Sequence, residues 1–395
     1  MIRHHRGRQH QRHLRHRRRQ HAQGLTQSLT YGPTSVALAV DPSAPIIVAP
    51  TNATIYTALG SSAILAAQQA NSALLTHLAE MQIGSGSPQV ATVLGTTTPT
   101  QTAFTGTASA LDDLLPALPQ AVGAMGGWFK GIGSFDNLTG SGGIPGFATQ
   151  AGGFLMGLDR VLAQNLTGGI ARGYLHTNVS EDTGSYGTID TPRLSVYGSY
   201  TFGNIAIDAT AGYGYDFYSA NRPFPLLGQT ASSSYNGQEA TAAMQASAKL
   251  NAGGFTLLPA VGLVYAHASQ NSASESGAPG FNLNVNYNSA NSLRPFAAIT
   301  AAKTFTTGDG TVLTPEADIA YSYETLGTTP PSTVSAGGGT FIVNGLLPQR
   351  NNLTIGGGIT AQLTDVLALE AAYHITPPTG NTLAQTLSIG LDYRF

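Results

Sequence analysis

The 395-residue sequence contains no cysteine and few charged residues. Without cysteine there is no disulfide framework, no thiolate metal site and no cysteine nucleophile. Asp, Glu, Lys and Arg make up 10% of the sequence, whereas an ordinary soluble domain has roughly 25%. Long apolar runs are also missing, since no stretch reaches the ~18 consecutive apolar residues of a membrane helix. The composition therefore indicates a surface that is not mainly in contact with water, in a chain without continuous greasy segments.

The positive charge is concentrated at the start of the chain. Eight of the 18 Lys and Arg residues lie in residues 1–19, together with five of the ten His. Residues 1–23 cannot pack a core, so they form either a nucleic-acid arm, a His-based metal binder, an unstructured tail or a wrongly chosen translation start. We favour the last two, because nothing downstream indicates a nucleic-acid partner. No signal peptide is visible, since the apolar stretch 36–40 is too short for an h-region of ~7–15 residues.

A helix is predicted for residues 61–82, where apolar residues recur at three- and four-residue spacings. Ser61 can cap its start, and Gly84 follows its end. Its polar residues, such as Gln68, Asn71 and Glu80, exclude a lipid-facing span. The helix is then either an ordinary surface or core helix, or one that lies in a polar lumen. Residues 84–124 are interpreted as linker, with a short helix at 109–115.

From Gly126 onward, apolar and polar residues alternate in long segments that turn signals separate. In residues 205–217, Ile205, Ile207, Tyr213 and Phe217 share one face with the intervening alanines and Tyr215, while Asp208 and Thr210 belong to the other. Twelve such segments are predicted: 126–135, 146–158, 166–180, 187–203, 205–220, 233–251, 254–271, 288–306, 311–326, 350–363, 366–376 and 383–395.

Short and long junctions alternate between these segments. Tight turns such as Gly203-Asn204 and Thr364-Asp365 alternate with long connections such as 221–232, 272–287 and 327–349. An outer-membrane barrel has this asymmetry, with tight turns on one side and long loops on the other. A soluble sandwich has strands of only ~5–6 residues and more charge. Aromatic residues near segment ends would form membrane-interface girdles: Trp128, Phe129, Tyr200, Phe202, Phe217, Tyr218, Tyr321, Tyr323, Tyr393 and Phe395.

Several motifs in residues 126–395 are found together in one known family. They are "GGWFKGIGSF" at 126–135, "GGFLMGLDRVL" at 152–162, "LTGGIARGYLHTNVS" at 166–180, the hairpin "RLSVYGSYTFGNIAIDATAGYGYDFYSANR" at 193–222, and a last strand that ends in Phe395. In their order and spacing they resemble the β-domain of a bacterial autotransporter, a type V secretion protein. The opening of strand one is marked by Trp128.

The resemblance implies a helix or linker in the barrel lumen, connected to an exported N-terminal passenger. Residues 61–82 are the first candidate for this helix, and residues 108–122 compete because they lie closer to strand one. Only about 60 residues precede the helix, so the chain is a translocator fragment, a mis-started reading frame or a translocator with a vestigial passenger.

Family resemblance also suggests two kinds of site. Some members release the passenger through an Asn in the luminal helix, which makes Asn71 an autocleavage candidate; the simpler interpretation is a polar helix residue. A final aromatic residue resembles the signal that the barrel-assembly machinery reads, which makes Tyr393 and Phe395 the candidate assembly signal. The charged residues predicted to face the lumen are Arg172, Asp208, Lys249, Glu316, Asp318, Glu370, Asp392 and Arg394. We expect them to form ion pairs with one another, since the sequence contains no H-E-x-x-H pair, P-loop or G-x-S-x-G elbow.

We therefore predict an all-β protein, a 12-stranded antiparallel transmembrane β-barrel with an N-terminal helix that can occupy its lumen. The predicted regions are 1–54 (biased region or passenger remnant), 55–125 (helix and linker) and 126–395 (barrel). The expected function is that of an autotransporter translocator in the bacterial outer membrane, monomeric, with no enzymatic activity, cofactor, metal or nucleic-acid partner. Its expected partners are membrane lipid, the barrel-assembly machinery, periplasmic chaperones and its own passenger. The alternatives are a porin-like or structural barrel without passenger, and a soluble β-rich binding protein with a basic nucleic-acid arm.

Overall fold

The computed structural model describes residues 25–31, 36–42, 50–83, 123–329 and 331–395. The tract 1–23 and the competing segments at 109–115 and 108–122 lie outside these residues. The chain divides into two compact units, 1–48 and 49–395. In the first, β1 (Leu25–Tyr31) pairs antiparallel with β2 (Val36–Pro42).

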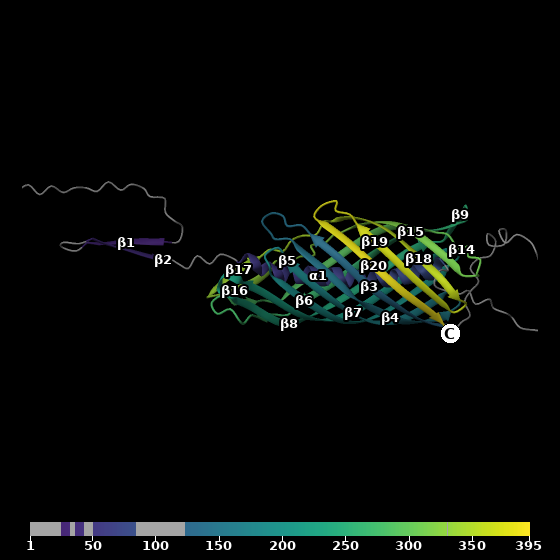
Figure 1. The fold of residues 1–395 in the computed structure, drawn as a ribbon, viewed down its shortest axis with the longest axis horizontal. Coiled ribbons are helices and arrows are strands. Elements are labelled where there is room, and N and C mark those ends of the chain that lie inside the picture. Colours follow the sequence, from purple (N-terminus) through teal and green to yellow (C-terminus); the bar gives the residue numbers. More distant parts are fainter. Residues whose placement is uncertain (1–24, 32–35, 43–49, 84–122, 330) are drawn as a thin grey trace, which may run out of the picture. The chain divides into compact units, whose positions relative to one another are not determined.

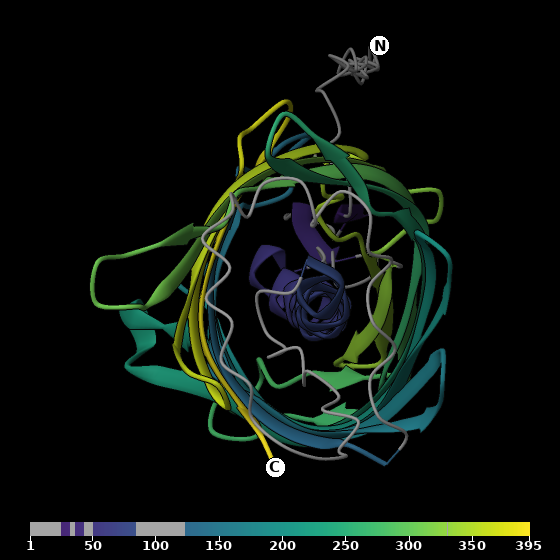
Figure 2. The ribbon, with the colours of Figure 1, turned by 90° about the vertical axis from the view of Figure 1, so that its right-hand side faces the viewer.

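The second unit is a closed antiparallel β-barrel (Figures 1 and 2). Closure comes from the pairing of β20 with β3 and of β13 with β15. The predicted twelve-stranded barrel is confirmed, and every predicted segment overlaps one wall strand. These are β3 (Met125–Leu138), β4 (Phe147–Ala163), β5 (Leu166–Glu181), β6 (Tyr186–Phe202), β7 (Ile205–Phe224), β8 (Gln229–Ala248), β10 (Phe255–Gln270), β13 (Asn288–Ala302), β15 (Val312–Tyr323), β18 (Asn351–Thr364), β19 (Leu367–Thr376) and β20 (Thr382–Arg394).

The two ends of the barrel differ in the length of their connections. At the short-turn end, β6 and β7 are joined by Gly203 and Asn204, and Gly203 has a φ of 60°, which glycine adopts without strain. The short strands β9 (Leu250–Ala252) and β14 (Phe305–Thr306) extend the wall there. At the long-loop end, two long connections pair with each other through β11 (Ala273–Ser274), β12 (Asn284–Val285), β16 (Ser332–Ala336) and β17 (Gly339–Val343). This end also carries the one-turn helix η2 (Pro225–Leu227).

Exposure alternates along the strands as the sequence predicts. In β7, Ile205, Ile207, Tyr213 and Phe217 are exposed, whereas Asp208 and Thr210 are buried. The buried face is the luminal one, because Asp208 and Thr210 bond to the helix inside the barrel. A wall with an apolar outer face satisfies its backbone hydrogen bonds between strands, which a bilayer requires.

One helix lies inside the ring of strands, as Figure 2 shows in the view along the barrel. It is α1 (Ile55–Ile83), and the one-turn helix η1 (Thr51–Thr54) precedes it. Most of its residues are buried around the whole circumference, which fits a helix surrounded by a wall. Among the described residues, no helix has both the length and the apolar character needed to cross a membrane.

The helix begins six residues before the predicted start at Ser61. Ser61 does not cap it, because its hydroxyl lies 2.7 Å from the Thr329 hydroxyl on a long loop. Gly60, inside the helix, lets α1 approach the wall: a Cβ there would lie 3.0 Å from Oε1 of Gln270. Capping rules consider only neighbouring residues, so they could not predict that the Ser61 hydroxyl contacts Thr329, which lies far along the chain.

Candidate functional site: the lumen and its helix

The long-loop end of α1 is held by a fully buried ion pair, here called the Arg222 cluster (Asn52, Tyr56, Arg222, Ser233 and Glu275). The Arg222 guanidinium on β7 donates to both carboxylate oxygens of Glu275 at 2.6 Å, and it also reaches Oδ1 of Asn52 at 2.7 Å. The Tyr56 phenol donates to Glu275 at 2.7 Å and lies 2.8 Å from the Ser233 hydroxyl. Wall, loop and helix start are thus joined through one carboxylate.

Neutral hydrogen bonds hold the middle of the helix. The Ser62 hydroxyl lies 2.8 Å from that of Thr149, and Gln68 Nε2 donates to the Ser292 hydroxyl at 2.5 Å. Ser292 in turn donates to Glu324, which Arg294 contacts at 2.9 Å. Such bonds let a polar lumen hold a helix without a large desolvation cost.

The short-turn end of α1 brings its own charged groups to the wall. Glu80 and Glu370 flank the Lys130 ammonium at 3.2 and 2.6 Å, and all three side chains are buried; we call them the Lys130 cluster. One turn earlier, His77 Nε2 lies 3.0 Å from Asp159 and Nδ1 lies 3.6 Å from Asp392. The terminal turn adds Gln82, which donates to Asp208 at 3.0 Å and accepts from Ser247 at 2.7 Å.

Trp128 points into the lumen and packs on the helix. Its ring lies 4.6 Å from that of His77, centroid to centroid, and its indole nitrogen donates to the Tyr197 phenol at 2.6 Å. Tyr197 donates onward to Asp159. The indole lies directly over Gly157, where a Cβ would be only 2.5 Å from the ring. Strand one is therefore joined to the helix by an aromatic contact as well as by Lys130.

Two predictions about individual residues are wrong. Arg172 is exposed on the outer face with Ile170 and Tyr174, since its position in β5 has the parity of those apolar residues rather than that of the buried Ala171. Trp128 and Tyr218 do not belong to the outer girdles, because both are buried in the lumen. The other eight predicted girdle residues are exposed.

All five acidic residues predicted to face the lumen lie on the luminal face. Asp208, Glu370 and Asp392 are buried, and Glu316 and Asp318 alternate with exposed residues of β15. Asp318 lies 3.1 Å from Nε2 of His374. Lys249 is half-buried in the turn after β8, and the Arg394 guanidinium lies against Gly126.

Asn71 is fully buried, and its side-chain oxygen accepts from Thr210 at 2.5 Å. Its amide nitrogen has no hydrogen-bond partner among the described residues. The helix residues that contact carboxylates include Tyr56, His77 and Gln82.

The last strand pairs with the first along its whole length. Asp392 lies opposite Trp128, and Arg394 lies opposite Gly126. The backbone N–H of Phe395 donates to the carbonyl of Met125 at 3.2 Å. The exposed rings of Tyr393 and Phe395 lie 5.5 Å apart on the outer face, so the terminus is held on the barrel wall.

Sequence reasoning missed several residues of these clusters. Arg222, Glu275, Arg193 and Glu239 are buried, and Arg193 lies 2.8 Å from Glu239 across the luminal face. Lys130 could have been found from the alternation of faces, because it lies two residues after Trp128 in "GGWFKGIGSF" and therefore shares its face of the strand. Among the described residues, no group of three or more His, Asp or Glu side chains is arranged to hold a metal ion.

This geometry defines a class: a transmembrane β-barrel whose lumen is occupied by a helix from the same chain. Residues 127–374 match the family model for the autotransporter β-domain. The fold is similar to the translocator domain of the autotransporter NalP from Neisseria meningitidis, with a TM-score of 0.55 and 16% identity over 70% of this chain and 91% of that one. It is also similar to the β-domain of the Bordetella autotransporter BrkA, with a TM-score of 0.53 and 14% identity over 69% of this chain and 100% of that one. No curated protein matches the sequence.

The chain belongs to the autotransporter β-domain family. It is an outer-membrane translocator domain, located in the bacterial outer membrane as the family and the barrel imply.

Proposed function

We propose that α1 is the part of the exported segment that remains in the lumen and closes it after export. The observation that carries this proposal is the direction of the helix: Ile55 lies at the long-loop end, and Ile83 packs on Leu258 and Ala302 at the short-turn end, the end at which β3 starts. A chain that enters β3 from the short-turn side reaches the outer side only by running back through the barrel. Residues 1–54 are then the exported portion, residues 55–125 the helix and linker, and residues 126–395 the translocator.

The polar contacts of α1 support retention after export. The Arg222 cluster holds one end and the Lys130 cluster the other, with neutral hydrogen bonds between them. A helix satisfies its own backbone groups, so a polar lumen can hold it at little cost. The hydrogen bonds of Tyr56 at one end and the ion pair of Glu80 at the other then oppose sliding in either direction, and the proposed mechanism has no catalytic step.

We further propose that this barrel acts as a monomer that contacts membrane lipid and is delivered by periplasmic chaperones to the barrel-assembly machinery. The assembly signal in this proposal is Tyr393 with Phe395, whose rings lie exposed beside the closing seam. Neither a nucleic acid nor a cofactor takes part.

The alternative is a porin-like barrel without passenger, and ion conductance separates the two. The full chain is compared in planar bilayers with a variant that lacks residues 55–122. We expect conductance to rise severalfold on deletion, because the helix fills the lumen. A variant that lacks residues 1–48 keeps α1 and serves as the matched control, with unchanged conductance. Equal conductance in all three proteins would refute the plug.

A further inference from the structure

An arginine, Arg172, lies within the apolar outer surface of the wall, away from the ends of its strand. Arg172 on β5 is exposed, and its cross-strand neighbours are Met156 on β4 and Leu194 on β6. Within the part of the chain that the structure describes, its side chain has no hydrogen bond or ion pair. A cation on a lipid-facing wall is costly at mid-membrane and tolerated near the interfaces.

Four exposed tyrosines mark the membrane interface at the long-loop end. Each donates its hydroxyl to a polar side chain on a neighbouring strand: Tyr174 to Asp190, Tyr265 to Asn291, Tyr321 to Asn351 and Tyr373 to Gln385. All four acceptors lie near the starts of strands that begin at the long-loop end. Tyrosines with an apolar ring and a bonded hydroxyl are typical of such an interface. Arg172 lies one outward position below Tyr174, so its long side chain can reach this level.

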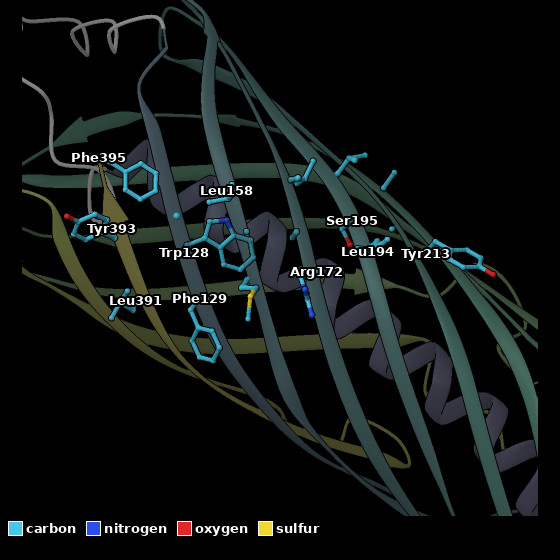
Figure 3. Close-up of a pocket in the computed structure, with 18 residues that line it drawn as sticks. Trp128, Phe129, Leu158, Arg172, Leu194, Ser195, Tyr213, Leu391, Tyr393 and Phe395 are labelled. Atoms are coloured by element: carbon cyan, nitrogen blue, oxygen red, sulfur yellow. The ribbon is translucent and has the colours of Figure 1, made fainter.

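An apolar groove runs along the outer wall past Arg172 (Figure 3). It extends from Tyr213 and Leu194 past Met156 and Phe129 to Leu391 and Phe395. Small residues of the wall, among them Gly157 and Ala171, form part of its floor. Tyr213 is far from the start of β7, whereas Leu391 lies close to the end of the chain, so the groove descends from Tyr213 past Arg172 toward the short-turn end. The part of the groove between Arg172 and Phe395 has the layout of a lipid, with a cation for the headgroup at its upper end and an apolar surface for the acyl chain below it.

We propose that this wall binds a phosphorylated lipid of the outer leaflet, with the phosphate on the Arg172 guanidinium and an acyl chain in the groove. Guanidinium binds phosphate through two parallel hydrogen bonds, and the apolar surroundings strengthen them. The one carboxylate close in register, Asp190, already accepts from Tyr174 and contacts Nδ1 of His176 at 2.7 Å. The guanidinium is thus the group left to neutralise an anion. The inference depends on the membrane location of the barrel and not on passenger export.

The test is lipid binding to the full chain in an uncharged detergent, followed by native mass spectrometry. Bis-phosphorylated lipid A and its dephosphorylated form are titrated separately. We expect the phosphorylated lipid to bind about tenfold more tightly than the dephosphorylated one. In Arg172→Gln the two should bind alike. Arg172→Lys, which keeps the charge but loses the paired hydrogen bonds, should give an intermediate ratio.

Arg160→Gln is the matched control, since Arg160 is also exposed on the outer face but lies at the short-turn end of β4. It should leave the preference for phosphorylated lipid unchanged. Heat-modifiable migration on a gel verifies that each variant is assembled, and Arg172→Lys carries the test if the glutamine variant is not.

The proposal would be overturned if the Arg172 and Arg160 variants lost the preference for phosphorylated lipid equally. It would also be overturned if millimolar inorganic phosphate displaced the lipid, or if a second copy of the barrel bound to this face in place of lipid.

Discussion

The two ends of the luminal helix are held in different ways. At the long-loop end the buried charges belong to the wall and a loop, Arg222 and Glu275, and α1 contributes only the neutral Tyr56. At the short-turn end α1 itself carries a charge, since Glu80 pairs with Lys130, and its His77 contacts the carboxylates of Asp159 and Asp392. In the first arrangement the ion pair forms between the wall and a loop, so it does not depend on any charge of the helix. The second makes the position of the helix depend on charges of its own.

Among the substitutions in the lumen, we expect Lys130→Met to disturb the position of α1 most. This ammonium contacts both Glu80 and Glu370, and its loss leaves the two buried acidic side chains without their cation. Breaking a buried ion pair costs about 3–5 kcal/mol, so the short-turn end of α1 should leave the wall. We expect bilayer conductance to rise. The double variant Lys130→Met/Glu80→Leu should return it toward the wild-type level, and low conductance in the single variant would contradict the role of this cluster.

Arg222→Met should cost somewhat less, about 2–4 kcal/mol. Glu275 keeps the Tyr56 phenol and the Leu283 N–H as donors after the guanidinium is lost. The disturbed element should be the connection 271–287 and not the helix. We expect faster proteolysis within this loop at unchanged conductance, with Arg160→Met as the exposed control. If conductance rose as much as in the Lys130 variant, the two ends of α1 would not be held in different ways.

Asn71→Ala should have a small effect, about 1 kcal/mol for one lost hydrogen bond with Thr210. Asn71 is the autocleavage candidate, and its side-chain oxygen already accepts from a neutral hydroxyl. We therefore expect both the wild-type and the variant chain to have their full-length masses after assembly, measured by intact mass spectrometry. A cleaved wild-type chain that becomes intact in the variant would instead establish Asn71 as the cleavage residue.

Deletion of Phe395 should change the stability of the assembled barrel least, because its ring is exposed on the outer face. The expected change is in the yield: less heat-modifiable barrel in the membrane, with the same fold in the molecules that assemble. Replacement by Tyr should restore the yield if an aromatic terminus is what is read. Wild-type yield after deletion would refute an assembly role.

Much of the wall could be predicted from the sequence, because a strand alternates its faces with a period of two. The same period also indicates the correct faces of Arg172 and Lys130. Arg172 shares the parity of Ile170 and Tyr174, which places it outside, and Lys130 shares that of Trp128, which lies inside. Assigning arginine to the lumen by charge alone overrode this signal, and assigning Trp128 to a girdle by residue type did the same.

The helix could be predicted only in part from the sequence. Its apolar spacing predicted a helix, but not that it begins at Ile55 or which wall residues it contacts. Tyr56 and Glu275 are separated by 219 residues and Glu80 and Lys130 by 50, and no local pattern relates them.

The sequence by itself determined the twelve strands, their turns and the apolar outer face, because these depend on neighbouring residues and on the period of the chain. Only the tertiary structure decided which charges meet in the lumen and which end of the helix faces the long loops. The physical reason is closure: once β20 pairs with β3, side chains from distant strands converge on one enclosed space, and burial there requires each charge to find a partner.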